Sequence, residues 1–374
     1  MDLEVDRGDL HRVRVVDPEV VAPGPGEAVI RIDAFALTTN NITYGVFGDA
    51  LRYWEFFPAA PAAADDASTA GWGRIPVWGF GEVVASAVDD VAVGERLFGF
   101  LPMSSSLTVT PGRGDERGFS DVAPHRAAMA GAYNRYARTA TDPSYRADRE
   151  DHQMLLYPLF FTSFLIDDFI ADNDGFGAEQ VVISSASSKT AIGVAHLVHH
   201  RGAARAVGLT SAANAAFVEG LGAYDEVRTY DDAGGLADAA AVYVDVAGDR
   251  DVLYAVHERL ADRIAHSMTV GGTHWDHQPA AHGDLPGPQP EFFFAPSQVA
   301  KRTQEWGQEG LDSRLGDAWS RYADWVDGWI EIRRATGPDA VTATYLELLD
   351  GRSDPKVGHV CSLPDPADGD GSAA

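Results

Sequence analysis

Two patterns of hydrophobic and polar positions divide the chain. In the first part, short apolar runs rich in β-branched and aromatic residues stand between turn-forming segments, at residues 11–17, 27–37, 81–86 and 95–102. Such runs predict β-strands. From Leu155 onward, strand-like runs alternate with helical patterns, which is typical of βαβ units. The pattern therefore predicts an α/β protein with a β-rich domain followed by a doubly wound domain.

The second domain is predicted to begin with an apolar helix over residues 157–171. The predicted strands are 180–185, 204–211, 226–230, 240–248 and 263–272, and the predicted helices are 189–202, 213–223 and 251–262. Because crossovers between parallel strands are right-handed, this order predicts a Rossmann-type parallel sheet with helices on both faces. A mainly helical segment is expected over 296–335, and a final strand near 357–363.

Length and composition limit the class of protein. A chain of 374 residues exceeds what one hydrophobic core usually organises, so we expect two domains. The single cysteine, Cys361, excludes an intrachain disulfide and a Cys-based structural zinc site, which fits a cytoplasmic protein. The net charge of −27 opposes nucleic-acid and anionic-lipid partners, because those need clustered Lys and Arg. Polar groups interrupt the apolar runs, so no membrane span is expected.

Four motifs follow one another along the chain. They are TTNNITYGVFGD, then PVWGFGEVVAS with GERLFGFLP, then GLGAYDEVRTYDD, and finally GRSDPKVGHVCSL. Together they resemble the zinc-free, quinone oxidoreductase-like branch of the medium-chain dehydrogenase/reductase superfamily, over nearly the whole chain. Gly79 and Gly99 fit the superfamily pattern, whereas Ala85 stands where a second glycine is usual. More narrowly, the chain looks like a divergent bacterial group attached to that superfamily.

The resemblance implies a domain division and an activity. Residues 1–154 and 336–374 would form a GroES-like β-barrel domain that the C-terminal strand completes, and residues 155–335 a Rossmann domain. The implied activity is NADPH-dependent hydride transfer to an enone, a quinone or a related carbonyl small molecule. It also implies a homodimer, in which the short apolar strand at 291–294 pairs with a second copy.

The loop that would hold the cofactor phosphates is SSASSKTAIG. A dinucleotide site normally has Gly-x-Gly-x-x-Gly here, so that the backbone can approach the pyrophosphate. In the functional interpretation, Ser187, Ser188, Lys189 and Thr190 bind phosphate together with the first N–H groups of the helix. In the structural alternative, Ser187 caps the helix and Lys189 is solvated. The loop also lacks glycines that a Walker A loop needs.

The end of the next strand predicts which cofactor is used. An acidic residue there would bind the ribose of NAD, but Thr210 and Ser211 occupy the place. This permits a 2′-phosphate and favours NADPH over NADH, although no basic partner for that phosphate is evident. Tyr230 matches a tyrosine that contacts the adenosine phosphate in similar reductases.

Candidate catalytic residues come from the TTNNITYG segment. The resemblance places Asn40, Thr43 and Tyr44 in the nicotinamide pocket, where hydrogen-bond donors would polarise a carbonyl and Tyr44 would donate the proton. The alternative is that Tyr44 is a core aromatic. Tyr53 and Trp54 would either wall a substrate slot or pack the structure around it.

Other polar residues leave further functions open. The cysteine and Gly-His-Glu ligands of zinc-dependent relatives are missing, and a loop with His274, His277 and His282 is interpreted as surface histidines. Arg135 and Arg138 would bind an acidic substrate or lie on a solvated surface. Because fold does not settle function, a lyase or isomerase and a non-catalytic nucleotide- or ligand-binding protein remain alternatives.

Overall fold

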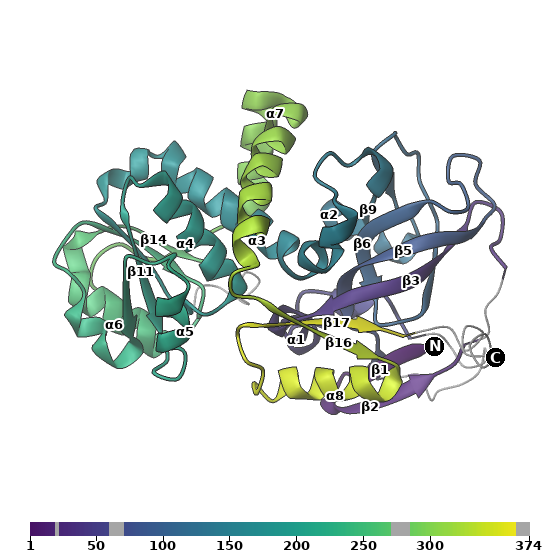
Figure 1. Ribbon diagram of the computed structural model, residues 1–374, viewed down its shortest axis with the longest axis horizontal. Coiled ribbons are helices and arrows are strands. Elements are labelled where there is room, and N and C mark those ends of the chain that lie inside the picture. Colours follow the sequence, from purple (N-terminus) through teal and green to yellow (C-terminus); the bar gives the residue numbers. More distant parts are fainter. Residues whose placement is uncertain (19–21, 60–70, 271–284, 364–374) are drawn as a thin grey trace. The chain divides into compact units, whose positions relative to one another are not determined.

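The computed structural model divides the chain into two compact units, which are described separately (Figure 1). The structure describes residues 1–18, 22–59, 71–270 and 285–363. The first unit comprises Met1–Leu155 and Ile330–Ala374, and the second comprises Leu156–Trp329.

The second domain boundary differs from the expected one. Residues 330–335 belong to the first unit rather than to the nucleotide domain. The reason is that strand β16 (Glu331–Thr336) pairs in parallel along its whole length with β17 (Val357–Ser362). The predicted helical segment therefore ends earlier than 335, because its last residues are drawn into a sheet.

The first unit is mainly β-structure. Besides β16 and β17, its strands are β1 (Asp2–Asp6), β2 (Asp9–Val16), β3 (Ala28–Leu37), β4 (Trp72–Gly73), β5 (Pro76–Ser86), β6 (Arg96–Pro102), β7 (Ser106–Val109), β8 (Gly118–Ser120) and β9 (Arg135–Arg138). The described strands form a three-stranded sheet, β2-β1-β4, and an eight-stranded sheet, β16-β17-β3-β5-β6-β9-β8 with β7 on β3. Strand β17 pairs antiparallel with β3, so the C-terminal strand completes this unit as expected. The GroES-like barrel stays a prediction.

Short helices fill in around these sheets. They are α1 (Thr39–Val46), the 3-10 turn η1 (Tyr53–Glu55), α2 (Gly131–Asn134) and α8 (Pro338–Leu349). Helix α8 packs against β2 and β16, and its Tyr345 hydroxyl donates to the Leu10 carbonyl at 3.0 Å (Figure 1). Fully buried Phe35, Phe57 and Phe100 belong to the core that these elements enclose. The apolar runs in the sequence thus become strands that are buried over much of their length, as in β1 and β6.

The second unit contains the predicted parallel sheet. Its strands are β10 (Gln180–Ile183), β11 (Arg205–Thr210), β12 (Glu226–Thr229), β13 (Ala241–Asp245), β14 (Ile264–Thr269) and β15 (Glu291–Phe292). Among the described residues they lie in the order β12-β11-β10-β13-β14-β15, and neighbouring strands pair in parallel. This is the doubly wound order 3-2-1-4-5-6. The predicted Rossmann-type sheet is confirmed.

The second unit also contains helices. They are α4 (Lys189–Arg201), α5 (Ala215–Gly220), α6 (Arg250–Leu260) and α7 (Ala295–Val326), with α3 (Glu150–Asp172) entering from the first unit's sequence. Gly193 lets α4 approach α3, because a Cβ there would lie 2.5 Å from the Ser163 hydroxyl. In the described residues one helix, Ala147–Asp172, is long and apolar enough by composition to cross a membrane, and 61% of its apolar window is buried in the protein. Such burial is typical of a core helix.

Candidate functional site

The first candidate region is the carboxyl edge of the parallel sheet. Strand order reverses between β10 and β13, since β11 and β12 lie on one side and β14 and β15 on the other. In doubly wound sheets, ligands bind in the crevice outside the carboxyl ends at such a switch point. The loop 184–188, which connects β10 to α4, lies at this edge.

The loop forms a tight turn without glycine. Ser185 has a φ of 50°, a left-handed conformation that is ordinarily taken by glycine. The Ala186 N–H donates to the Leu209 carbonyl at 2.9 Å. A Cβ at Gly208 on β11 would lie 2.9 Å from the Ala186 Cβ, so the close approach is made by Gly208 instead. Gly208 thus makes room for the Ala186 side chain next to β11.

The residue that caps α4 is Ser188, not Ser187 as the structural alternative expected. The Ser188 Oγ accepts a hydrogen bond from the Ala191 N–H at 3.3 Å. The Ser187 Oγ instead accepts one from the Asn214 side-chain amide at 3.0 Å. The helix begins at Lys189, as predicted, so the residue directly before it, Ser188, takes the capping position.

The remaining predicted cofactor residues lie around this loop. Half-buried Lys189 and Thr190 form the first turn of α4, and the Thr190 carbonyl accepts from the Ser163 hydroxyl at 2.8 Å. Tyr230 opens a 3-10 turn after β12, and burial raises the pKa of its hydroxyl while contact with Ser185 lowers it. These residues come from separate segments, and the sheet brings Tyr230 to the loop.

Thr210 has an unusual environment at the end of β11. Its side chain is 1% exposed, and its hydroxyl finds no hydrogen-bond partner among the described residues. Buried hydroxyl groups are normally bonded, because an unmet hydrogen bond costs about 1–3 kcal/mol. The partly exposed Ser211 follows it. The Thr210 hydroxyl, which lacks a hydrogen-bond partner among the described residues, therefore lies at the strand end where the sequence analysis expected the ribose of a dinucleotide.

A buried pair that the sequence analysis missed joins β10 to β13. The Ser184 Oγ donates to the Asp245 carboxylate at 2.6 Å and accepts from the Val246 and Ala247 N–H groups, each at 2.9 Å. The carboxylate also accepts from the Gly248 N–H at 3.2 Å. Burial raises the pKa of Asp245, while these hydrogen bonds lower it. The only signal in the sequence was a polar residue at the end of each strand.

The second candidate region lies in the first unit, on α1. The Asn40 amide donates to the Tyr44 hydroxyl oxygen at 2.7 Å, since residues four apart share one face of a helix. Tyr44 is 6% exposed, and burial raises the pKa of its hydroxyl well above the usual value. The Thr43 hydroxyl turns back to the Thr39 carbonyl at 3.4 Å. The structure therefore unites Asn40 and Tyr44 but leaves Thr43 outside the pair.

Aromatic rings surround Tyr44. The Tyr53 ring lies 4.3 Å from the Tyr44 ring between centroids, and Phe100 meets Tyr44 edge-on at 5.6 Å. Tyr133 packs on Phe100 at 4.7 Å. Trp54 is buried, and a Cβ at Gly48 would lie 2.2 Å from its indole nitrogen, so Trp54 is a packing residue. The neighbouring residues Tyr53 and Trp54 thus have different roles.

The rings of Tyr44, Tyr53, Phe100 and Tyr133 are called the aromatic wall below, and a buried arginine supports them. Arg126 is 1% exposed and forms an ion pair with Asp121 at 3.0 Å. Its guanidinium also donates to the Asn134 side chain at 3.0 Å, to the Tyr136 hydroxyl at 2.9 Å and to the Tyr133 carbonyl at 2.6 Å. This fixes the short α2 turn that carries Tyr133. No sequence pattern pointed to Arg126.

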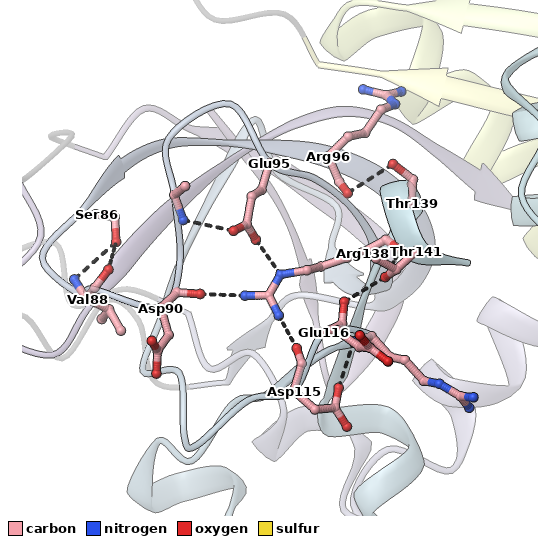
Figure 2. A network of polar contacts seen from close by, with 12 residues as sticks. Ser86, Val88, Asp90, Glu95, Arg96, Asp115, Glu116, Arg138, Thr139 and Thr141 are labelled. Atoms are coloured by element: carbon pink, nitrogen blue, oxygen red, sulfur yellow. Dashed lines mark hydrogen bonds and ion pairs between the residues drawn. The ribbon is translucent and has the colours of Figure 1, made fainter. Parts of the chain in front are cut away.

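Figure 2 shows why Arg138 is a structural residue. Its guanidinium donates to the Glu95 carboxylate at 2.8 Å, to the Asp90 carbonyl at 2.5 Å and to the Asp115 carbonyl (Figure 2). Arg135 is more exposed and pairs with the Asp115 carboxylate at 3.0 Å. With its donors committed to the protein, Arg138 is not available as the substrate contact that the sequence suggested.

The histidines that could be considered as metal ligands from the sequence cannot be placed. His274, His277 and His282 lie outside the described residues. Within the described ranges, no three His, Cys, Asp or Glu side chains gather as metal ligands would. Independence from zinc stays a prediction.

Comparison with protein families identifies the chain at the level of family. A family described as "Protein of unknown function (DUF2855)" matches residues 35–354. The chain belongs to this family. No curated protein matches it. The matched residues span parts of both units, and they include the parallel sheet and the aromatic wall of this chain.

Solved structures share the fold of this DUF2855 protein. CurA from Vibrio vulnificus, solved in complex with NADPH, has a TM-score of 0.57 and 12% identity, with 95% of each chain covered. The CurF ER cyclopropanase of the curacin A biosynthetic pathway has a TM-score of 0.59 and 14% identity, covering 97% of this chain and 99% of that one. The CurK enoyl reductase has a TM-score of 0.53 and 15% identity, with 97% and 99% covered. The likeness confirms that the chain has the fold of these proteins. Its place as a divergent group of the medium-chain superfamily stays a prediction.

Proposed function

We propose that this protein is an NADPH-dependent reductase that transfers hydride to an enone, quinone or related carbonyl small molecule without zinc. The observation that carries the proposal is the carboxyl edge of the parallel sheet. There a strand, a tight loop and a capped helix meet an orphaned Thr210 hydroxyl at the switch point of a 3-2-1-4-5-6 sheet. This is the arrangement in which dinucleotides are bound.

The residues present fit a dinucleotide. A buried hydroxyl without a partner gains a hydrogen bond if a ribose or phosphate oxygen reaches Thr210. Ser187, Ser188, Lys189 and Thr190 would surround the pyrophosphate at the start of α4, where the helix dipole favours an anion. Ser211 and Tyr230 would complete the adenosine side. Bound NADPH supplies the hydride.

On the substrate side, Asn40 and Tyr44 are the proposed catalytic pair. The Asn40 amide donates to the Tyr44 oxygen, which leaves the phenolic proton directed elsewhere. Because burial raises the pKa of Tyr44, this residue stays protonated at neutral pH. It can therefore donate a hydrogen bond to the substrate oxygen, and it would pass its proton only to a strongly basic oxygen such as that of an alkoxide. Thr43 would serve at most as a neighbouring polar group.

Titration of the purified protein with NADPH and NADH tests this proposal. We expect NADPH to quench tryptophan fluorescence saturably and to raise the melting temperature more than NADH does, because a ligand that binds only the folded state stabilises it. NADPH oxidation with a panel of quinones and enones then tests turnover. Binding without turnover on the panel would favour a nucleotide-binding protein. Binding of neither nucleotide would remove the basis of the proposal.

We also propose that the protein forms a homodimer through β15. This strand ends the six-stranded sheet of described residues, and Phe292 and Phe294 are 40% and 41% exposed. An apolar sheet edge invites pairing with another strand. A second copy would extend the sheet across a two-fold axis. Light scattering is expected to give a dimer mass, and Phe292→Lys to give a monomer; a wild-type monomer at all concentrations would refute the dimer.

A further inference from the structure

Two partly buried phenols converge at the aromatic wall of the first unit. The hydroxyl oxygens of Tyr53, on η1, and Tyr133, on α2, lie 3.4 Å apart. This distance is longer than the usual 2.5–3.0 Å between hydroxyl groups, so their mutual hydrogen bond is weak. Two donors this close can both reach a single oxygen atom about 2.7 Å from each. Neither residue belongs to the motifs that indicated the reductase fold.

Both rings are held from behind by the core. The Tyr53 ring packs on buried Tyr44, and the Tyr133 ring packs on fully buried Phe100. The Arg126 guanidinium fixes the Tyr133 backbone through its carbonyl. The positions of the two hydroxyl groups are therefore set before any ligand binds, which is the condition for effective electrostatic stabilisation.

Tyr53 keeps its proton at neutral pH. Burial is the largest cause that raises the pKa of Tyr53, and the neighbouring Tyr133 and Tyr44 raise it further. A neutral phenol can donate a hydrogen bond, whereas a phenolate cannot. The pair therefore favours an acceptor such as a carbonyl oxygen rather than a cation.

We propose that Tyr53 and Tyr133 together bind the carbonyl oxygen of the substrate and stabilise the negative charge that develops on it. This inference rests on the proposed reductase function. When the electrophilic carbon gains hydride, its π electrons move onto that oxygen, and both hydroxyl groups donate to it. A proton then neutralises the product.

The surrounding rings indicate the substrate class. Tyr133 contacts Phe56, Trp78 and Phe100, with ring centroids 4.7–6.1 Å apart. Aromatic faces favour flat, apolar partners. The nearby positive charge of Arg126 is already neutralised by an ion pair with a buried carboxylate. The substrate assigned here is a neutral, flat carbonyl compound such as a quinone or an aryl enone.

A pair of matched probes tests the role of the oxygen without turnover. Menadione carries two carbonyl oxygens, and 2-methylnaphthalene has a similar ring system without them. Their dissociation constants would be measured by tryptophan fluorescence in the absence of nucleotide. We expect Tyr53→Phe and Tyr133→Phe each to weaken menadione binding roughly two- to tenfold, the effect of one hydrogen bond. Binding of 2-methylnaphthalene should stay within twofold.

The control variant is Tyr145→Phe, which removes a phenol of the same unit that donates instead to Glu150. It should leave both affinities unchanged, and melting temperatures would confirm that all variants fold. With NADPH present, the double Tyr53→Phe/Tyr133→Phe variant should lower kcat for menadione by about a hundredfold or more. If menadione is not reduced at all, the reductase proposal fails for quinones, and the binding experiment still decides on the hydroxyl pair. Unchanged menadione affinity, or an equal loss for both probes, would overturn the pair.

Discussion

The carboxyl edge of the parallel sheet and the aromatic wall position their polar groups in different ways. At the sheet edge, Ser184 and Ser188 are bonded mainly to backbone N–H groups that the fold supplies. At the wall, Tyr133 depends on one buried side chain, Arg126, with partners from Asp121 to Tyr136. Backbone groups remain in place when one side chain changes, whereas a single guanidinium does not. The wall should therefore be the more fragile region.

The largest effect on stability is expected when Arg126, which supports the aromatic wall, is replaced. Arg126→Met leaves the Asp121 carboxylate buried without its partner, so we expect the free energy of unfolding to fall by about 3–5 kcal/mol. Urea unfolding followed by fluorescence measures it. The control Arg135→Met removes an exposed pair with Asp115 and should cost less than about 1 kcal/mol. Equal costs for the two variants would contradict a structural role for Arg126.

The next effect concerns the sheet edge. Lys189→Ala should weaken NADPH binding roughly ten- to a hundredfold, because a charge-assisted hydrogen bond contributes about 1.5–3 kcal/mol. Its effect on folding should be smaller, since a cation at a helix N-terminus is unfavourable without an anion. Calorimetric titration compares it with Lys301→Ala, which removes an exposed lysine paired with Asp172. A dissociation constant unchanged within twofold would end the phosphate role.

A smaller effect distinguishes the two serines of the loop. Ser188→Ala removes the cap of α4 and should lower the free energy of unfolding by about 1 kcal/mol. Ser187→Ala loses only the hydrogen bond from Asn214 and should cost about half as much. Urea titration of both variants makes the comparison. A larger cost for Ser187→Ala than for Ser188→Ala would indicate that Ser187 caps the helix.

The smallest expected effect is a loss of stability of the second unit at acid pH. Burial, and then the charges of His200 and Arg321, lower the pKa of His196 in the second unit to about 4. The unfolded chain binds this proton near pH 6.5, so the stabilisation is present above pH 6.5 and is lost as pH falls toward 4. Denaturation at pH 7 and pH 5 should show a smaller loss for His196→Gln than for the wild type. Identical losses would exclude His196 as the cause.

Much of the second unit could be predicted from the sequence. Each βαβ segment carries its own apolar period and its own turn signals, as in 189–202 with the terminal Gly202, which takes a left-handed φ of 67°. The loop after β10 is also local, so its position at a helix start could be predicted. The prediction of Ser187 as the cap was wrong, because the Ncap directly precedes the helix, and before Lys189 that residue is Ser188.

The first unit shows what only the tertiary structure decides. Its candidate site joins α1, η1, β5, β6 and α2, which are far apart in the sequence. Tyr53 and Trp54 are adjacent in the chain, yet one presents a hydroxyl to Tyr133 and the other is packed against a glycine. The sequence by itself determined the fold class and the alternation of strands and helices in the second unit, because hydrophobic periodicity is a local property. The family resemblance rested on short motifs, which are local as well. Only the tertiary packing decided that the hydroxyl groups of Tyr53 and Tyr133 meet, because these residues are about eighty positions apart in the sequence.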